Sequence, residues 1–344
     1  MTSVITGKDR VGFGVNFMPN APVVEVVEWA KAVEGHGYDL LGISDSQSIS
    51  RDVYVTLAHC ATATSRIRFG SRVITPVTRH PAVAASAAAT LEELAPGRTM
   101  IGIGTGDSAA YTIGAKAVSL AELREYTLAI RNLMTTGHTE YHGKAATFTW
   151  SRARVPIYLA ASGPRTLRLA GLIADGAVIR TGLTPDIVRD SIAQVRAGAH
   201  EAGRDPAEID LWWWPDVNVG TSYPEAVEEI KTSLAMAGNH LTRFTAEGKH
   251  VPPDLLPKFR TLAERYVFGE HARPGSANCR LITELGLVDY LAERFAIVGT
   301  PADCVKKIER AIDAGARQFW MSIHFHDKFR LIRDFAEQVI PAFR

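Results

Sequence analysis

Short apolar runs alternate with longer stretches of helical periodicity along most of the chain. The first run, residues 11–17, precedes a stretch at 21–34 in which apolar residues recur every three or four positions, and this predicts a strand followed by an amphipathic helix. Gly35 and Gly37 mark the end of that helix. The same alternation recurs toward the C-terminus. It predicts eight strands, at residues 11–17, 40–44, 67–74, from 99 onward, and at 157–161, 176–179, 209–219 and 318–324.

Eight strand–helix alternations in one chain predict a (β/α)8 TIM barrel, with an open, doubly wound sheet as the alternative. One stretch breaks the rhythm. After a predicted helix at 224–237, residues 238–297 show an irregular pattern that is only partly helical. A structureless loop of that length is uncommon in a compact domain, so we predict a helical insertion between strands seven and eight that forms part of a lid. Residues 1–344 are then expected to form a single barrel domain.

Composition excludes several kinds of partner. The 344 residues are 46% hydrophobic and carry a formal net charge of +1, without the basic excess that a nucleic acid or an anionic membrane attracts. The N-terminal residues lack the apolar core of a signal peptide, and no apolar run reaches membrane-spanning length. Cys60, Cys279 and Cys304 form no C-x-x-C pair, which is typical of reduced core residues. We therefore expect a soluble, cytoplasmic protein that binds neither nucleic acid nor membrane.

Strand four runs directly into a glycine-rich segment that ends in an acid and a hydroxyl. Gly102, Gly104 and Gly106 occupy alternate positions and are followed by Asp107 and Ser108. Glycine weakens a strand, so its repetition indicates that another group approaches the backbone closely. The G-x-G-x-G spacing, without a following amphipathic helix, does not match the dinucleotide-binding fingerprint. A tight turn without a ligand is the alternative.

Strand five ends in a second candidate anion site. Ser162, Gly163, Pro164 and Arg165 open the helix that follows. Free backbone N–H groups, a hydroxyl and a guanidinium at a helix N-terminus suit a phosphate group, while an ordinary helix cap with an early proline is the alternative. Because the strand C-termini of a barrel share one pocket, this segment and Gly104–Ser108 are expected to lie side by side.

Three residues at the strand C-termini are candidates for acid–base chemistry: Asp45, Asp107 and His324. A carboxylate in such a place can instead accept hydrogen bonds from loop amides. His324 and His326 would point to opposite faces of a strand and lack a third ligand, so no metal site is expected. Residues 212–214 are three consecutive tryptophans on strand seven, and at least one should face the barrel interior or mouth, where a flat ligand could stack.

Four sequence blocks, in order along the chain, carry a family resemblance. They are Ser44-Asp45; Thr78-Arg79-His80-Pro81; Gly102-Ile103-Gly104-Thr105-Gly106-Asp107-Ser108-Ala109; and Ala160-Ala161-Ser162-Gly163-Pro164 followed by Ala174-Asp175-Gly176. Together they resemble the bacterial luciferase-like superfamily of flavin- and deazaflavin-dependent oxidoreductases. Within it, the sequence is most similar to the branch that contains methylenetetrahydromethanopterin reductase.

The resemblance implies a flavin-like cofactor across the strand C-termini, with its phosphate held by the strand-four and strand-five blocks. It also implies a bulge in strand three, with a non-proline cis peptide bond between Arg72 and Val73 that backs the cofactor ring. In deazaflavin-using members the strand-two aspartate, here Asp45, contacts that ring. The cofactor-binding residues expected on this basis are Asp45, Ser46, Arg72, Val73, Ile74, Thr75, Gly104, Thr105, Gly106, Asp107, Ser108, Ala161, Ser162, Gly163 and Pro164.

One departure from the family pattern affects the mechanism. In the glucose-6-phosphate dehydrogenase member, an acid at the position of Asp107 is a proposed proton donor, and a histidine follows the strand-two aspartate. The corresponding residue here is Ser46, so neither that acid–base mechanism nor sugar-phosphate oxidation carries over intact. By its predicted place in the pocket, His324 is the candidate to replace the missing histidine.

The resulting prediction is an oxidoreductase that uses coenzyme F420 and transfers a hydride between deazaflavin C5 and an organic substrate, with Asp107 or His324 handling the proton. One alternative is an FMN-dependent monooxygenase that uses O2. Another is a barrel that binds a flavin without catalysis. The alanine-rich helix from residue 82 would allow close approach of a second helix, so a homodimer or a higher homo-oligomer is expected.

Overall fold

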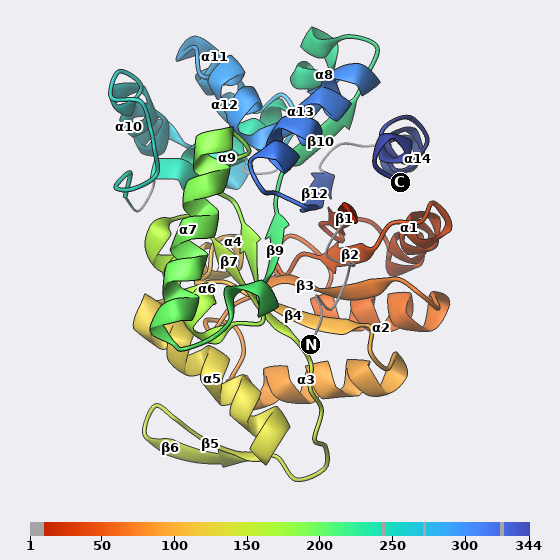
Figure 1. The fold of residues 1–344 in the computed structure, drawn as a ribbon, viewed down its shortest axis with the longest axis vertical. Helices are drawn as coiled ribbons and strands as arrows, with labels where there is room; N and C mark the ends of the chain where they lie inside the picture. The colour runs from red at the N-terminus through yellow and green to blue at the C-terminus, as the bar shows by residue number, and fades with distance from the viewer. Residues whose placement is uncertain (1–9, 243–244, 271–272, 324–326) are drawn as a thin grey trace.

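Eight parallel strands close into a barrel in the computed structural model, which describes residues 10–242, 245–270, 273–323 and 327–344 (Figure 1). They are β1 (Gly12–Phe17), β2 (Leu40–Ile43), β3 (Arg68–Ile74), β4 (Thr99–Ile103), β7 (Ile157–Ala161), β8 (Gly176–Ile179), β9 (Asp210–Trp213) and β12 (Gln318–Ile323). The barrel closes because β1 pairs in parallel with both β2 and β12. The predicted (β/α)8 barrel is therefore confirmed, and the open sheet is wrong.

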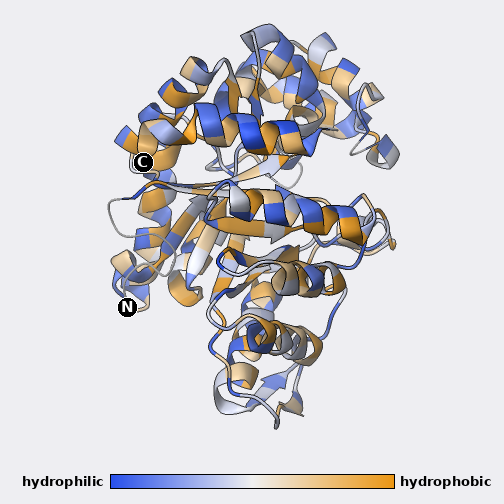
Figure 2. Cartoon of the chain, turned by 90° about the vertical axis from the view of Figure 1, so that its right-hand side faces the viewer, coloured by the Kyte–Doolittle hydropathy of each residue, from blue (hydrophilic) through white to orange (hydrophobic). Residues whose placement is uncertain are grey.

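Helices follow the strands and cover the outside of the barrel. They are α1 (Val23–Gly35), α2 (Val53–Ala63), α3 (Pro81–Leu94), α5 (Leu120–Thr136), α6 (Pro164–Ile173), α7 (Pro185–Glu201), α13 (Pro301–Asp313) and α14 (Lys328–Gln338). Side chains of Asp52, Ser119 and Thr300 cap α2, α5 and α13 by accepting backbone N–H bonds. The strands are mostly hydrophobic, whereas the helices alternate hydrophobic and hydrophilic residues (Figure 2). Short 3-10 turns lie at Pro206–Glu208, Phe268–Glu270 and Ile340–Phe343.

Two apolar clusters stabilise the barrel. The larger lies between strands and helices, and the smaller fills the barrel interior with Leu40, Met100, Tyr158, Val178, Trp212 and Trp320. The buried alanines of α3 belong to the larger cluster, and α3 packs against α2 and α5 of the same chain. The small side chains of α3 therefore serve packing within the chain, so they no longer support the expectation of a homodimer.

Strand seven is not continuous, so the predicted strand at 209–219 is wrong in this respect. It breaks into β9 and β10 (Asp216–Val219). Pro215 lies at the break, where it has no N–H group to donate to a neighbouring strand. Beyond it, β10 pairs with β12 at one position and runs parallel to β11 (Ala296–Gly299), a strand that the sequence pattern did not predict. A hairpin of β5 (His138–Tyr141) and β6 (Lys144–Thr147) was also missed.

Between β10 and β11 the chain forms a group of helices with an apolar core of its own. They are α8 (Tyr223–Glu229), α9 (Lys231–Thr242), α10 (Leu256–Arg265), α11 (Ala277–Glu284) and α12 (Val288–Phe295). They gather at one end of the molecule, opposite the β5–β6 hairpin (Figure 1). The predicted helix at 224–237 is thus two helices, and the second continues for five residues beyond its predicted end. The described part of the chain contains no helix with the length and apolar character of a membrane span.

Candidate active site

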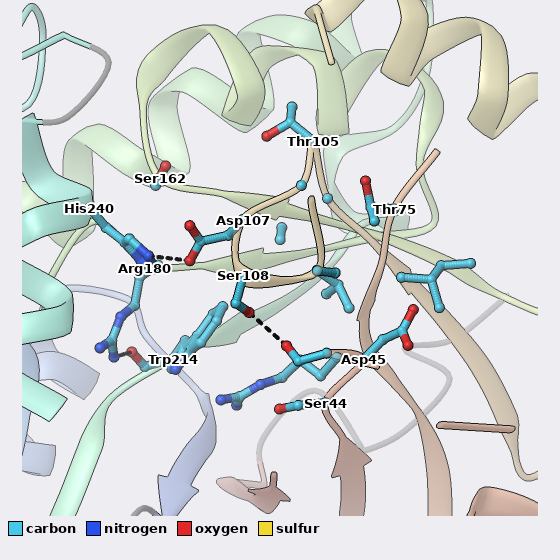
Figure 3. A pocket seen from close by; sticks show the side chains of 18 of the residues that line it. Ser44, Asp45, Thr75, Thr105, Asp107, Ser108, Ser162, Arg180, Trp214 and His240 are labelled. Atoms are coloured by element: carbon cyan, nitrogen blue, oxygen red, sulfur yellow. Dashed lines mark hydrogen bonds and ion pairs between the residues drawn. The ribbon is translucent and has the colours of Figure 1, made fainter. Parts of the chain in front are cut away.

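A pocket opens at the C-terminal ends of the barrel strands, with one wall formed by helix α9 (Figure 3). Most of the residues predicted from the sequence line it: Asp45, Ser46, Arg72, Val73, Ile74, Thr75, Gly104, Thr105, Gly106, Asp107, Ser108, Ala161 and Ser162. Gly163 and Pro164 are not part of the lining but form the N-terminus of α6 directly behind Ser162. His324 lies outside the described residues.

The glycines of strand four make room for a bulge in strand three. The pairing register between β3 and β4 shifts between Ser71 and Ile74, and the peptide bond between Arg72 and Val73 is cis, at the position that the resemblance implies. A Cβ atom at Gly102 would lie 2.3 Å from the Ser71 carbonyl oxygen. The close approach expected at the strand-four glycines is therefore made by β3 of the same chain. The bulge of β3 forms one wall of the pocket.

The segment after β4 turns sharply beside Ser162. Gly106 has φ +109°, and a Cβ atom there would lie 3.0 Å from the Thr75 hydroxyl oxygen. Thr105 is anchored because its carbonyl accepts the Val118 N–H at 2.8 Å. The hydroxyls of Thr105 and Ser162 line the same pocket, beside the first turn of α6. Hydroxyl groups and a helix N-terminus suit a phosphate.

Asp45 is a buried carboxylate that forms an ion pair with Arg79. Arg79 also contacts the Asp52 carboxylate at 2.9 Å. Burial raises the pKa of the Asp45 carboxyl above its usual range, although the Arg79 charge acts in the opposite direction. Its second oxygen, Oδ1, is buried and has no hydrogen-bond partner among the described residues. Since buried acceptors are normally satisfied, this oxygen is suited to accept a hydrogen bond from a bound molecule.

Arginine and tryptophan side chains form the opposite wall. Arg72 donates to the Trp320 carbonyl and the Ser322 hydroxyl, and its guanidinium lies 4.1 Å from the Trp214 ring centroid. The Trp214 indole donates to Ser322 Oγ at 2.7 Å. Burial, together with the nearby charge of Arg180, lowers the pKa of Arg72 well below its usual range. As predicted, at least one of the three consecutive tryptophans faces the barrel interior or mouth: Trp212 belongs to the interior cluster and Trp214 lines the pocket, whereas Trp213 packs in the larger cluster.

Asp107 pairs with a histidine that the sequence did not single out. The Asp107 Oδ2 atom lies 2.6 Å from Nε2 of His240, which is on α9 (Figure 3). Both side chains line the pocket and are only partly exposed, 29% and 25% respectively. The predicted helix ended at residue 237, which left His240 in irregular chain. The available signal was its spacing from Met236, four residues earlier, since both face the pocket from one side of α9.

Neighbouring contacts fix the loops that carry these acids. Ser46, the position where the family pattern has a histidine, places its hydroxyl 2.6 Å from that of Ser108. Gln47 donates to the Ala109 carbonyl at 2.8 Å. Ser108 begins the short helix α4 (Ser108–Tyr111), so these contacts tie the loop after β2 to the loop after β4. The hydroxyl of Ser46 thus contacts Ser108, which follows Asp107 in the chain.

Residues 10–318 match the model of a family described as luciferase-like monooxygenases. The chain belongs to this family. The resemblance inferred from four sequence blocks is thereby confirmed. The pocket of this family member has features that suit a flavin-like group: a buried carboxylate oxygen without a hydrogen-bond partner among the described residues, a hydroxyl-lined turn at a helix N-terminus, and the Trp214 ring on one wall.

Relatives span nearly the whole chain. A 5,10-methylenetetrahydromethanopterin reductase of Methanolobus tindarius is 29% identical over 323 residues, which cover 89% of this chain and 92% of the relative. An F420-dependent glucose-6-phosphate dehydrogenase of Nakamurella multipartita is 29% identical over 340 residues, with 93% and 92% covered. The coenzyme F420 dependent tetrahydromethanopterin reductase from Methanopyrus kandleri superimposes with a TM-score of 0.76 at 26% identity, over 97% of this chain and all of that one. All three are oxidoreductases by name.

Proposed function

We propose that the protein is an F420-dependent oxidoreductase that transfers a hydride between deazaflavin C5 and a small organic substrate. The observation that carries this proposal is Asp45, whose buried Oδ1 atom has no hydrogen-bond partner in the described part of the chain and which lines the same pocket as Thr105 and Ser162. One cofactor would bind both groups: its ring N–H would donate to Asp45, and its phosphate would accept hydrogen bonds from Thr105 and Ser162. Two relatives with F420 in their names support the choice of cofactor.

Each part of the pocket has a separate role in this proposal. Ser162, Thr105 and the first turn of α6 would hold the phosphate, and Asp45 would accept a hydrogen bond from the ring. The bulge after Arg72 would back the ring. When bound, the deazaflavin supplies a carbon that gives or accepts a hydride. Helix α9 and Trp214 would keep water from the reacting carbon, and Asp107 would hold the proton that accompanies the hydride.

An FMN-dependent monooxygenase is the second candidate, because the family description names monooxygenases and FMN also carries a phosphate. A barrel that binds a flavin without catalysis is the third. The buried Asp45 carboxylate favours F420 over FMN, because the resemblance implies that this aspartate contacts the ring in deazaflavin-using members. The predicted cytoplasmic location, single domain and homodimer remain part of this proposal.

The first test is equilibrium binding of F420 and of FMN to the purified, cofactor-free protein, followed by fluorescence. We expect F420 to bind more tightly than FMN. Ser162→Ala should weaken F420 binding by a factor of about 10 to 150, because a hydrogen bond to a charged phosphate contributes about 1.5–3 kcal/mol. Ser86→Ala, on helix α3 outside the pocket, is the matched control and should bind F420 as the wild type does.

The two opposite results separate the alternatives. Tighter binding of FMN would overturn the choice of cofactor and favour the monooxygenase, which would then consume oxygen in the presence of substrate. Binding of neither compound would show that the phosphate site is wrongly assigned. Binding of F420 without turnover of any substrate would favour the non-catalytic barrel.

A further inference from the structure

The charged side chains that line the described pocket all have partners. Asp45, Arg180 and Asp107 each form an ion pair, and Arg72 donates to the Trp320 carbonyl and to Ser322. Beside the Asp107–His240 pair, away from the hydroxyls and helix N-terminus proposed to hold the cofactor phosphate, an anionic substrate group would find no uncommitted cation among the described lining residues, and burying an uncompensated charge is costly. The lining is therefore suited to a substrate whose reacting part is uncharged.

The Asp107–His240 pair differs from the other pairs in its exposure and origin. Its two side chains line the pocket and point toward each other, whereas the Asp45 carboxylate is fully buried (Figure 3). Asp107 follows a barrel strand, and His240 comes from helix α9 of the inserted group. A carboxylate hydrogen-bonded to an imidazole is an arrangement that can accept and release a proton.

The position of His240 is fixed by the fold. Helix α9 ends two residues later, where the Lys249 ammonium donates to the Leu241 carbonyl at 2.9 Å. Arg294 in turn donates to the carbonyls of Lys249 and Thr181, at 2.5 and 2.9 Å. Since Thr181 follows strand β8, these bonds fasten the end of α9 to the barrel and hold the imidazole over Asp107.

We infer that Asp107 and His240 act as one proton-sharing pair and that the substrate is an uncharged alcohol or the corresponding carbonyl compound. This inference rests on the proposed function. In the oxidative direction, the C–H bond breaks as its electron pair leaves as a hydride to oxidised F420, which is the oxidant. The O–H bond also breaks, a C=O bond forms, and the proton passes to the Asp107 carboxylate, whose Oδ2 atom keeps its hydrogen bond to His240 Nε2. In the reductive direction, the hydride returns to the carbonyl carbon and the proton to the carbonyl oxygen. Asp107 is the catalytic residue, and His240 is the positioning residue that shares its proton.

The chain provides a matched control for His240. His250 also comes from the inserted region, and its Nε2 atom lies 3.0 Å from Oδ2 of Asp190 on α7. This second histidine–aspartate pair does not line the pocket. Because His250 has φ +51°, asparagine is its appropriate replacement.

A first experiment needs no cofactor. In protein labelled with 15N at histidine, an imidazole N–H donated to a carboxylate gives a strongly downfield proton resonance. We expect one that disappears in both His240→Gln and Asp107→Asn and persists in His250→Asn, at low temperature. A spectrum without such a resonance, or one in which Asp107→Asn leaves it unchanged, would overturn the pair.

A second experiment uses the F420-loaded protein with neutral secondary alcohols, such as 2-propanol and cyclohexanol, and with glucose 6-phosphate, followed by the loss of oxidised cofactor. We expect turnover of a neutral alcohol. His240→Gln should lower its rate about 100-fold and leave F420 affinity within about twofold, and added imidazole should restore the rate of His240→Ala. His250→Asn should behave as the wild type.

Other outcomes of this second experiment contradict the inference. Two outcomes would overturn the substrate class: turnover of glucose 6-phosphate without turnover of a neutral alcohol, and no turnover of any of the compounds tested. A His240→Ala variant with an undiminished rate, or one that imidazole does not restore, would overturn the role of the histidine. Failure of the wild type to bind F420 would instead contradict the proposed function, and the resonance experiment would still test the pair.

Discussion

Replacing Gly106 by valine is expected to lower the affinity for F420 about 1000-fold, or about 4 kcal/mol. The residue has φ +109°, a conformation that costs a residue with a side chain roughly 1–2 kcal/mol. Its Cβ atom would also lie 3.0 Å from the Thr75 hydroxyl oxygen. The turn that carries Thr105 must then move, and the proposed phosphate site loses hydrogen bonds to a charged group, each of which contributes about 1.5–3 kcal/mol. Fluorescence titration of the cofactor-free variant measures the loss.

Gly114→Val is the control for backbone strain. Gly114 also has a positive φ, +74°, and it lies in the chain just after α4, but apart from its two chain neighbours no heavy atom of the described residues comes within 4 Å of its Cβ position. This variant should lose stability to thermal unfolding to a similar degree and still bind F420 as the wild type does. Equal loss of affinity in the two variants would mean that strain in this segment, and not the site at Gly106, controls binding.

The barrel could be predicted because its signal is repeated. Each strand is short, buried and followed by a helix with one apolar face, and the repetition limits the topology even where single boundaries are uncertain. The rule that strand C-termini share one pocket then placed Asp45, Asp107 and Ser162 together, although they are far apart in the sequence. This part of the site follows from topology alone.

The errors come from features with a tertiary cause. Pro215 was visible in the sequence, but the departure of β10 from the barrel depends on its pairing with β11, which lies about 80 residues later. The buried pairing partners of a strand cannot be identified from its own residues. Similarly, α9 extends past residue 237 because the inserted helices bury Leu241 in their shared core.

His240 was missed for a related reason. The strand-end rule assigns residues to the pocket only when they follow a barrel strand, and His240 comes from an inserted helix that reaches the pocket from the side. Sequence reasoning assigned the missing imidazole to His324 for its strand-end position. The contact between His240 and Asp107 depends on how the inserted helices are fastened to the barrel by Arg294, a packing relation without a local sequence signal.

Arg79→Leu is expected to destabilise the protein by about 3–5 kcal/mol at neutral pH, because it leaves the Asp45 carboxylate buried without a counter-charge. The Asp45 side chain is fully buried, and that of Arg79 is only 13% exposed. Burial already holds the pKa of Asp45 above its unfolded value, and loss of the arginine raises it further. The folded variant then binds a proton more readily than the unfolded chain, so its stability falls as pH rises. Urea unfolding at weakly acidic and at neutral pH measures both effects.

Arg189→Leu removes a comparable arginine from an exposed pair, since Arg189 and Asp186 are 60% and 93% exposed. That loss should be below about 1 kcal/mol and nearly independent of pH. Should Arg79→Leu cost no more than this control, Asp45 is already protonated in the folded protein. Its Oδ1 atom would then belong to a neutral acid, and the hydrogen bond proposed from the cofactor ring to a carboxylate would have to be replaced by one that the protonated acid donates.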